Sequence, residues 1–299
     1  MTLCLAWKKN TNLSFMSDSR LSGGGGIITD NANKIFTIKI NVIREPKKEN
    51  ALVFDSAYGL CFAGSYLNGS NLADTISELT SNINIYNDET INFDKISEIA
   101  FILYEYISKH LMEINGKRAL SEVFFAGYCP ESEQNKLSKF YSIIGEDNKI
   151  KFEFENIELQ ENEFAYLGDS NAKQFAKQLE TKIKRPYTEF HLLDEVIKEK
   201  TLTTVGGCIQ YGCIVKNRFR TYGIVDYELY KPQNETDTYK EYYRVKEKFN
   251  FRSIPFNWED SKLNKLKLRL GKVFMAPFAD RKRKLQDESK NKNEAKFTK

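Results

Sequence analysis

The chain has 299 residues, of which 41% are apolar, 29% charged and 13% aromatic, and its net charge is +4. The aromatic content excludes a largely disordered chain, and the small net charge excludes a dedicated nucleic-acid-binding protein. The length allows one large domain or two small ones, with enough apolar residues for a substantial core.

The five cysteines and two histidines are too scattered to suggest a metal site. No two cysteines form a C-x-x-C pair, and a zinc site needs several Cys or His ligands at close spacing. No apolar run approaches the roughly 18 residues of a membrane span, and the first one ends at Lys8, too early for a signal peptide. We therefore expect a cytoplasmic protein that needs no metal or organic cofactor.

The first part of the chain is typical of strands separated by turns. Four consecutive glycines at 23–26 permit unusual backbone angles. Alternating apolar residues and turn residues define the strands. They are expected over residues 2–8, 12–18, 34–43, 51–54 and 58–64, with the first two and the last two forming hairpins.

Two helices are expected next, over residues 67–82 and 93–114. The second has one continuous apolar face and Asn92 or Asp94 as its N-cap. Further elements are expected as strands at 121–128, 139–145 and 150–155, helices at about 170–183 and 189–200, and strands at 207–215 and 218–229. This order does not alternate as in a doubly wound sheet. It predicts a mixed α+β fold with two antiparallel sheets and two helical layers.

Composition changes after residue 229. Residues 230–279 combine aromatic clusters with many charges and predict an extension that packs on the domain 1–229 or on a neighbouring subunit. Residues 280–299 lack apolar residues and predict a disordered basic tail. The basic run 281–284 is most simply a solvated terminus, so we expect no nucleic-acid partner.

Thr2 is the candidate nucleophile. Trimming of Met1 would leave Thr2 with a hydroxyl that can attack a carbonyl and a free α-amine whose reference pKa is about 7.7–8.0. A threonine activated by its own amine is a known nucleophile–base pair. An Asp and a Lys on nearby strands could tune both groups, and Asp18 and Lys34 are the candidates.

Three short motifs near the start of the chain occur in the order seen in a known family of hydrolases. Thr2, the run Ser-Asp-Ser-Arg at 17–20 and Lys34 have the spacing found in proteasome β subunits and bacterial proteasome-like peptidases, and the run Ala-Gly-Ser at 63–65 matches a third element. The chain resembles this family, more loosely up to about residue 229. The resemblance implies the N-terminal nucleophile (Ntn) hydrolase fold, a four-layer αββα sandwich.

The resemblance also implies roles for individual residues. Lys34 and Asp18 would set the field around Thr2, the backbone N–H of Gly64 would hold the oxyanion, and Ser170 would lie near the nucleophile. The residues that would line the substrate pocket are Leu21, Ser22, Ala32, Ile35, Phe62 and Tyr66. Because the pocket is mostly apolar, we expect cleavage after medium or large apolar residues.

Each of these residues also has a structural interpretation. Lys34 could be an ordinary surface lysine, Asp18 a turn residue bonded to its own backbone, and Gly64 a plain strand-to-helix turn. The pocket positions could be core residues. The three motifs together favour the functional interpretation.

The chain departs from the family pattern in two places. Asp169 immediately precedes Ser170, which leaves open which of the two matches the family's serine. The Asp and Ser that support the amine in active members correspond to Leu202 and Val205, so Thr203 or Thr204 would have to substitute.

These departures leave three hypotheses open. The first is a threonine peptidase that hydrolyses peptides or unfolded proteins, assembles into a homo-oligomeric ring and works with a separate ATP-driven (AAA+) unfoldase. The second is an inactive structural subunit of the same fold. The third is an Ntn amidase that acts on a small molecule.

Overall fold

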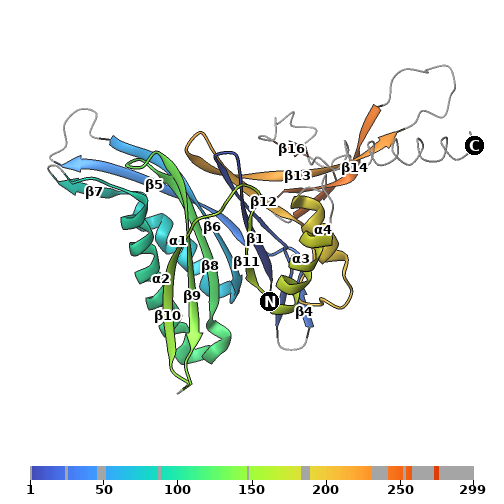
Figure 1. Ribbon diagram of the computed structural model, residues 1–299, viewed down its shortest axis with the longest axis horizontal. Coiled ribbons are helices and arrows are strands. Elements are labelled where there is room, and N and C mark those ends of the chain that lie inside the picture. Colours follow the sequence, from blue (N-terminus) through green and yellow to red (C-terminus); the bar gives the residue numbers. More distant parts are fainter. Residues whose placement is uncertain are drawn as a thin grey trace, which may run out of the picture.

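The computed structural model in Figure 1 combines helices and strands in one mixed α+β arrangement. The described residues are 2–23, 26–45, 52–86, 89–146, 148–182, 189–230, 242–251, 254–257 and 273–275. For residue 45 and from residue 224 onward, only the backbone is described. Met1 and residues 280–299, which carry the expected trimming site and basic tail, lie outside the described residues.

The helices lie where the apolar periodicity predicts them. They are α1 (Tyr66–Thr80), α2 (Phe93–Asn115), α3 (Ser170–Lys182) and α4 (Glu189–Lys198), with a short 3-10 helix η1 (Gly116–Ala119). Asn92 caps α2, because its side chain accepts a hydrogen bond from the Lys95 backbone N–H. This confirms one of the two expected N-caps.

Most of the expected strands are also present. In chain order the first strands are β1 (Leu3–Lys9), β2 (Asn12–Ser17), β3 (Leu21–Gly23), β4 (Gly26–Thr29), β5 (Ile35–Glu45), β6 (Leu52–Gly64) and β7 (Ile83–Tyr86). The next are β8 (Ser121–Cys129), β9 (Gln134–Ile144), β10 (Ile150–Ile157), β11 (Phe164–Gly168), β12 (Gln210–Val215) and β13 (Arg218–Tyr230).

The second expected hairpin is wrong. Residues 52–64 form the single strand β6, which pairs along its length with β5. The polar residues near its middle suggested a turn, but they have partners outside the strand. Ser56 donates to the carbonyl oxygen of Asn217 at 2.6 Å, and Asp55 pairs with Arg218. Those contacts come from the distant β12–β13 turn, which local sequence cannot reveal.

The two expected sheets are joined into one 14-stranded sheet. Its main path runs β10-β9-β8-β6-β13-β12-β2-β1-β11. The two halves meet where β6 and β13 pair in parallel, at the single position Ala57–Arg218. Figure 1 shows α1 and α2 on one side of the strands and α3 and α4 on the other.

Three apolar clusters hold these elements together. One joins α1 and α2 to strands of the β5–β10 half, around Tyr104 and Phe140. Another joins α3 and α4 to the β1–β12 half, around Leu193 and Tyr211. The third lies between the two halves of the sheet, around Phe15.

The backbone after residue 230 continues the sheet. Strands β14 (Tyr242–Phe251) and β16 (Val273–Met275) pair with β13, and β15 (Ile254–Asn257) pairs with β14. How this extension packs on a domain or a neighbouring subunit remains a prediction. Within the described ranges, no helix is both long enough and apolar enough to cross a bilayer.

Candidate active site

Thr2 and Lys34 meet at the start of two strands. Thr2 immediately precedes β1 and Lys34 immediately precedes β5, and the Lys34 ammonium donates a hydrogen bond to the Thr2 hydroxyl oxygen. Both residues are buried, with 3% and 1% of their surface exposed. The ammonium also donates to the backbone carbonyl of Arg20. A cation in this position stabilises the hydroxyl oxygen when it loses its proton.

Asp18 supplies the opposite charge. One carboxylate oxygen lies 3.1 Å from the Lys34 ammonium, and the Asp18 side chain is fully buried. The carboxylate also accepts backbone hydrogen bonds from Leu3 at 3.0 Å, Arg20 at 3.1 Å and Gly206 at 3.0 Å. A buried carboxylate needs a cation and several donors to offset its lost hydration, and Asp18 has both.

Arg20 forms hydrogen bonds that connect two loops near the Lys34–Asp18 pair, one containing Asp30 and one containing residues 203–205. Its guanidinium donates to both oxygens of Asp30, at 2.7 and 3.2 Å, and to the backbone carbonyls of Thr203 and Val205. The hydrogen bond from Arg20 holds the pKa of the Asp30 carboxyl below its usual value. Arg20 is thus a structural residue here, as its place in the motif implies.

Asp169 holds the other side of Thr2. Its backbone N–H donates to the Thr2 carbonyl at 2.9 Å, and its carboxylate caps α3 by accepting from Asn171 and Ala172 at 2.9 and 3.2 Å. The Thr204 hydroxyl donates to the same carboxylate at 2.9 Å. A hydroxyl from the loop before β12 therefore reaches Asp169, and whether Thr203 or Thr204 supports the Thr2 amine stays a prediction.

Gly168 allows the chain to approach Thr2 this closely. Its φ is +106°, and a Cβ added there would lie 1.8 Å from the Thr2 carbonyl oxygen and 3.1 Å from the Ala63 Cβ. No side chain fits in that space. Its backbone N–H donates to Glu122 at 2.7 Å, which fixes the turn from β11 into α3. Thr2, Gly168 and Ala63 are thus neighbours.

Gly64, the candidate oxyanion donor, follows Ala63 directly. Its φ is +109°, and an added Cβ would lie 2.6 Å from the Leu120 carbonyl oxygen. Gly64 lines a cleft of about 1130 Å³. The other residues lining the cleft are Leu21, Ser22, Gly23, Gly26, Ile27, Ser65, Tyr66, Lys117, Arg118, Leu120, Thr203 and Thr204.

The structure divides the expected pocket residues into two groups. Leu21, Ser22 and Tyr66 line the cleft. Ala32, Ile35 and Phe62 are buried, with 5%, 1% and 1% of their surface exposed, and are not among its lining residues. Ile35 and Phe62 belong to apolar clusters, so in this structure they are core residues, which is the alternative that the sequence left open.

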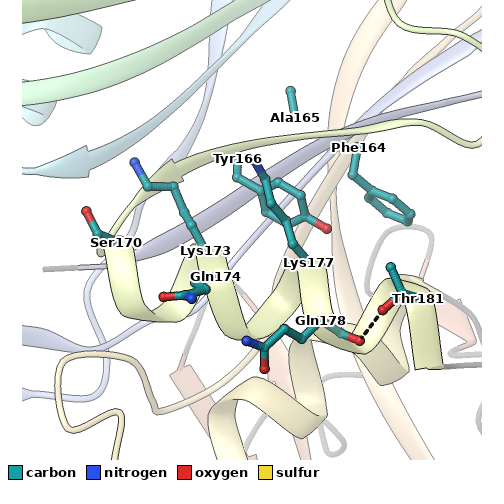
Figure 2. Close-up of a pocket in the computed structure, with 9 residues that line it drawn as sticks. All are labelled: Phe164, Ala165, Tyr166, Ser170, Lys173, Gln174, Lys177, Gln178 and Thr181. Atoms are coloured by element: carbon teal, nitrogen blue, oxygen red, sulfur yellow. Dashed lines mark hydrogen bonds between the residues drawn. The ribbon is translucent and has the colours of Figure 1, made fainter.

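Ser170 lies at the exposed start of α3, and within the described residues no hydrogen bond joins it to Thr2. Figure 2 shows it at the start of α3, beside a separate hollow of about 690 Å³ between α3 and β11. Ser170 is exposed, whereas its neighbour Asp169 is buried and contacts Thr2. Of these two residues, Asp169 is the one whose backbone N–H bonds to Thr2.

Leu202 and Val205 lie in the loop before β12, and Gln210 is the first residue of that strand. Leu202 and Val205 are buried in the cluster under α3 and α4, so no polar group replaces the expected Asp and Ser at those two positions. Gln210, which sequence analysis missed, accepts from the Lys34 backbone N–H at 2.9 Å and donates to the Ala32 carbonyl at 2.6 Å. No sequence pattern pointed to Gln210, because its burial and its place at the start of β12 appear only in the structure.

Comparisons with known proteins give a distant likeness. No family model matches the chain, and no curated protein matches it. A solved structure of the Anbu (Gly-1) mutant from Hyphomicrobium sp. strain MC1 is 15% identical, covers 74% of this chain and 84% of that chain, and has a TM-score of 0.48. Anbu is a bacterial proteasome-like protein with the Ntn-hydrolase fold. The similarity concerns the fold at a coarse level and assigns no role to any residue.

Proposed function

We propose that this protein is a threonine-type peptidase whose nucleophile is the Thr2 hydroxyl after removal of Met1. The observation that carries the proposal is the buried Lys34 ammonium, which contacts the Thr2 hydroxyl oxygen and is balanced by Asp18. Burying a lysine is costly unless it is paired and hydrogen-bonded, so a site built around one indicates a use for its charge.

The reaction would proceed in two steps. The free α-amine of Thr2 takes the hydroxyl proton, through a water molecule, while the oxygen attacks the carbonyl carbon of the scissile peptide bond. The resulting ammonium returns that proton to the leaving amine as the carbon–nitrogen bond breaks. Water then hydrolyses the ester on Thr2 and frees the enzyme. The Lys34 cation attracts the negative charge that develops on the hydroxyl oxygen, and it repels a proton on the nearby amine because like charges repel.

Gly64 is proposed as the oxyanion donor. It borders the cleft, and its neighbour Ala63 lies beside the turn that holds Thr2. One well-aimed backbone donor is worth roughly 3–4 kcal/mol of transition-state stabilisation. A side chain at position 64 would collide with the Leu120 carbonyl oxygen and would be strained at a φ of +109°, which explains why a glycine suits it.

The finer features of the proposal rest on the resemblance. They are a four-layer αββα sandwich, assembly into a homo-oligomeric ring, a peptide or unfolded-protein substrate delivered by a separate unfoldase, and a cytoplasmic location. The three apolar clusters, which alternate with helical and strand layers, support the sandwich.

A non-catalytic subunit of the same fold is the second candidate. The observation that favours it is the apolar, buried character of Leu202 and Val205, where active members carry Asp and Ser. An amidase acting on a small molecule is a third candidate, and an open monomeric cleft rather than a closed ring would favour it. Size-exclusion chromatography separates those two states.

Covalent labelling tests the peptidase directly. We expect an epoxyketone or β-lactone probe to label the wild-type protein and to fail with Thr2→Ala, while Thr11→Ala, a change at an exposed turn, is labelled normally. Intact-mass measurement of each variant reports whether Met1 has been removed. A wild-type protein that has lost Met1 and still resists both probes would refute the peptidase and leave the structural subunit.

A further inference from the structure

The cleft beside Gly64 carries charge of one sign. Among its lining residues are two cations, Lys117 and Arg118, and no carboxylate. Its apolar members, which include Leu21, Tyr66 and Leu120, form a surface suited to an apolar side chain. The cleft therefore offers an apolar wall next to a positively charged rim.

The two cations lie on a well-anchored turn. Both belong to η1, which follows α2, and the backbone carbonyl of Ala119 in the same turn accepts from the Asn68 side chain at 2.8 Å. Asn68 also donates to Ser108 of α2 at 2.9 Å and is fully buried. The turn is thus bonded to α1 and α2 together, so its cations are carried on a fixed support.

The same turn is joined to the candidate oxyanion donor. Leu120 follows η1 and its carbonyl accepts from the Ser65 N–H at 2.9 Å, while its N–H donates to the Lys117 carbonyl at 3.2 Å. Gly64 precedes Ser65 and is in register with Ser121. Backbone hydrogen bonds therefore connect the turn that carries Lys117 and Arg118 to the segment at Gly64, where the scissile carbonyl would bind.

Neither cation has a protein counter-charge in the part of the chain that the structure describes. Both side chains are exposed, and no ion pair or side-chain hydrogen bond of either is found there. An unpaired cation on a fixed turn can pair with a substrate without first breaking an internal bond, and arginine suits a carboxylate through its two parallel donors.

We propose that Lys117 and Arg118 form a subsite for an acidic side chain, so that this cleft selects peptides with an aspartate or glutamate next to an apolar residue. The cleavage part of this inference rests on the proposed peptidase function, whereas the binding part does not. Each exposed ion pair is worth about 1.4- to fivefold in affinity, and mid-range factors of about two to three for each of the two cations multiply to a preference of about three- to tenfold.

Matched peptides measure this preference. We would compare fluorogenic peptides that keep one apolar residue at the cleaved bond and carry either Glu or Gln at each neighbouring position in turn. The wild-type protein should cleave the Glu peptide about three to ten times faster at one position at least, expressed as kcat/KM. The ratio should shrink at 0.5 M salt, because exposed charges are screened there.

Charge variants assign the effect to the two residues. Lys117→Gln/Arg118→Gln should reduce the Glu-to-Gln ratio to about one, and Lys117→Glu/Arg118→Glu should favour a Lys peptide instead. Lys109→Gln/Lys200→Gln removes two exposed positive charges that are not among the cleft residues and should keep the wild-type ratio. A ratio of one in the wild type, or a ratio unaffected by the cleft variants, overturns the inference.

Binding to Thr2→Ala separates this inference from the peptidase itself. Fluorescence anisotropy with the same labelled peptides should show the Glu preference without any turnover. If the wild type cleaves nothing but Thr2→Ala binds Glu peptides through the two cations, the peptidase fails and the acidic subsite stands. If cleavage occurs with no Glu preference in rate or binding, the subsite fails and the peptidase stands.

Discussion

The Lys34 ammonium donates to the hydroxyl oxygen of Thr2, a residue 32 positions earlier in the chain. That contact depends on Asp18, which lies 3.1 Å from the ammonium and accepts three backbone hydrogen bonds. The three side chains form one electrostatic unit with almost no exposure. Removing one charge therefore affects both the stability and the chemistry of the site.

The first prediction concerns the balance of this unit. Lys34→Met leaves the Asp18 carboxylate buried without a cation and should lower the free energy of unfolding by about 3–5 kcal/mol. Adding Asp18→Asn removes the uncompensated charge and should recover part of that loss, because the two effects are coupled. Urea unfolding of both variants measures the two values.

Lys39→Met is the matched control. Lys39 lies on β5 like the residues that follow Lys34, but it is exposed, so the change should alter stability by no more than about 0.5 kcal/mol. Equal losses for Lys34→Met and Lys39→Met would show that the Lys34–Asp18 pair contributes no electrostatic stabilisation.

The second prediction concerns Gly168. A methyl group there would lie 1.8 Å from the Thr2 carbonyl oxygen, and the φ of +106° is strained for any other residue. Gly168→Ala should therefore displace Thr2 and abolish probe labelling, with a stability loss of several kcal/mol. Gly116→Ala controls for backbone strain alone, because Gly116 also has a positive φ, of +56°, but nothing lies within 4 Å of the added methyl.

The control should cost about 1–3 kcal/mol through backbone strain, since Gly116 has a φ of 56° and a ψ of −147°, and it should keep labelling at the wild-type level. Comparable labelling of the two alanine variants would mean that the close approach of Gly168 to Thr2 is not needed by the site.

The third prediction separates the two roles of Asp169. Asp169→Ala removes the cap of α3 and the acceptor for Thr204, and should cost about 1 kcal/mol for the cap alone. Asp169→Asn retains a capping oxygen and should lose only a few tenths of a kcal/mol. Thermal unfolding gives the stabilities, and the rate of probe labelling reports the effect on Thr2.

Ser170→Ala is the corresponding control, since Ser170 is exposed one position later. It should label at the wild-type rate and unfold at nearly the wild-type temperature. A labelling defect in Ser170→Ala that exceeds the defect in Asp169→Ala would restore Ser170 to the role that the family resemblance implies.

Local patterns predicted most of the fold, because helix and strand periodicities report the burial of one face. The order of the motifs singled out Thr2, Asp18 and Lys34, which stand at the ends of predicted strands, where side chains from different segments can meet. Local patterns failed for β6, where Ser56 and Asp55 looked like turn residues. Their partners, Asn217 and Arg218, are more than 160 positions away.

In the candidate site, too, contacts between distant parts of the chain decide what local sequence leaves open. The sequence offers two polar residues after Gly168, both capable of capping a helix, and only the turn geometry decides that Asp169 faces Thr2. Gln210 bonds to the Lys34 backbone across 176 positions of chain, a contact that no spacing rule predicts. Sequence thus identifies the charged centre, while tertiary contacts identify the residues that hold it in place.

The last prediction is a pH dependence from Asp30. Arg20 lowers the pKa of this carboxyl in the folded state, mainly through the hydrogen bond between them, relative to about 3.9 in the unfolded chain. A lowered folded pKa contributes stability that is fully present above the unfolded pKa and is lost as the pH falls through the folded pKa. Because 43% of the Asp30 side chain is exposed, the contribution should stay below about 1 kcal/mol.

Asp30→Asn removes this contribution. The wild type should be more stable than Asp30→Asn at pH 7 and at pH 5 by nearly the same amount, and the difference should shrink as the pH falls below about 4 and through the lowered pKa of folded Asp30. Asp74→Asn, a change at an exposed position of α1, controls for the loss of one negative charge and should show a smaller difference at neutral pH. Urea unfolding of the three proteins across this range tests the prediction, and a difference that grows as the pH falls would contradict it, because the ion pair must weaken when Asp30 is protonated.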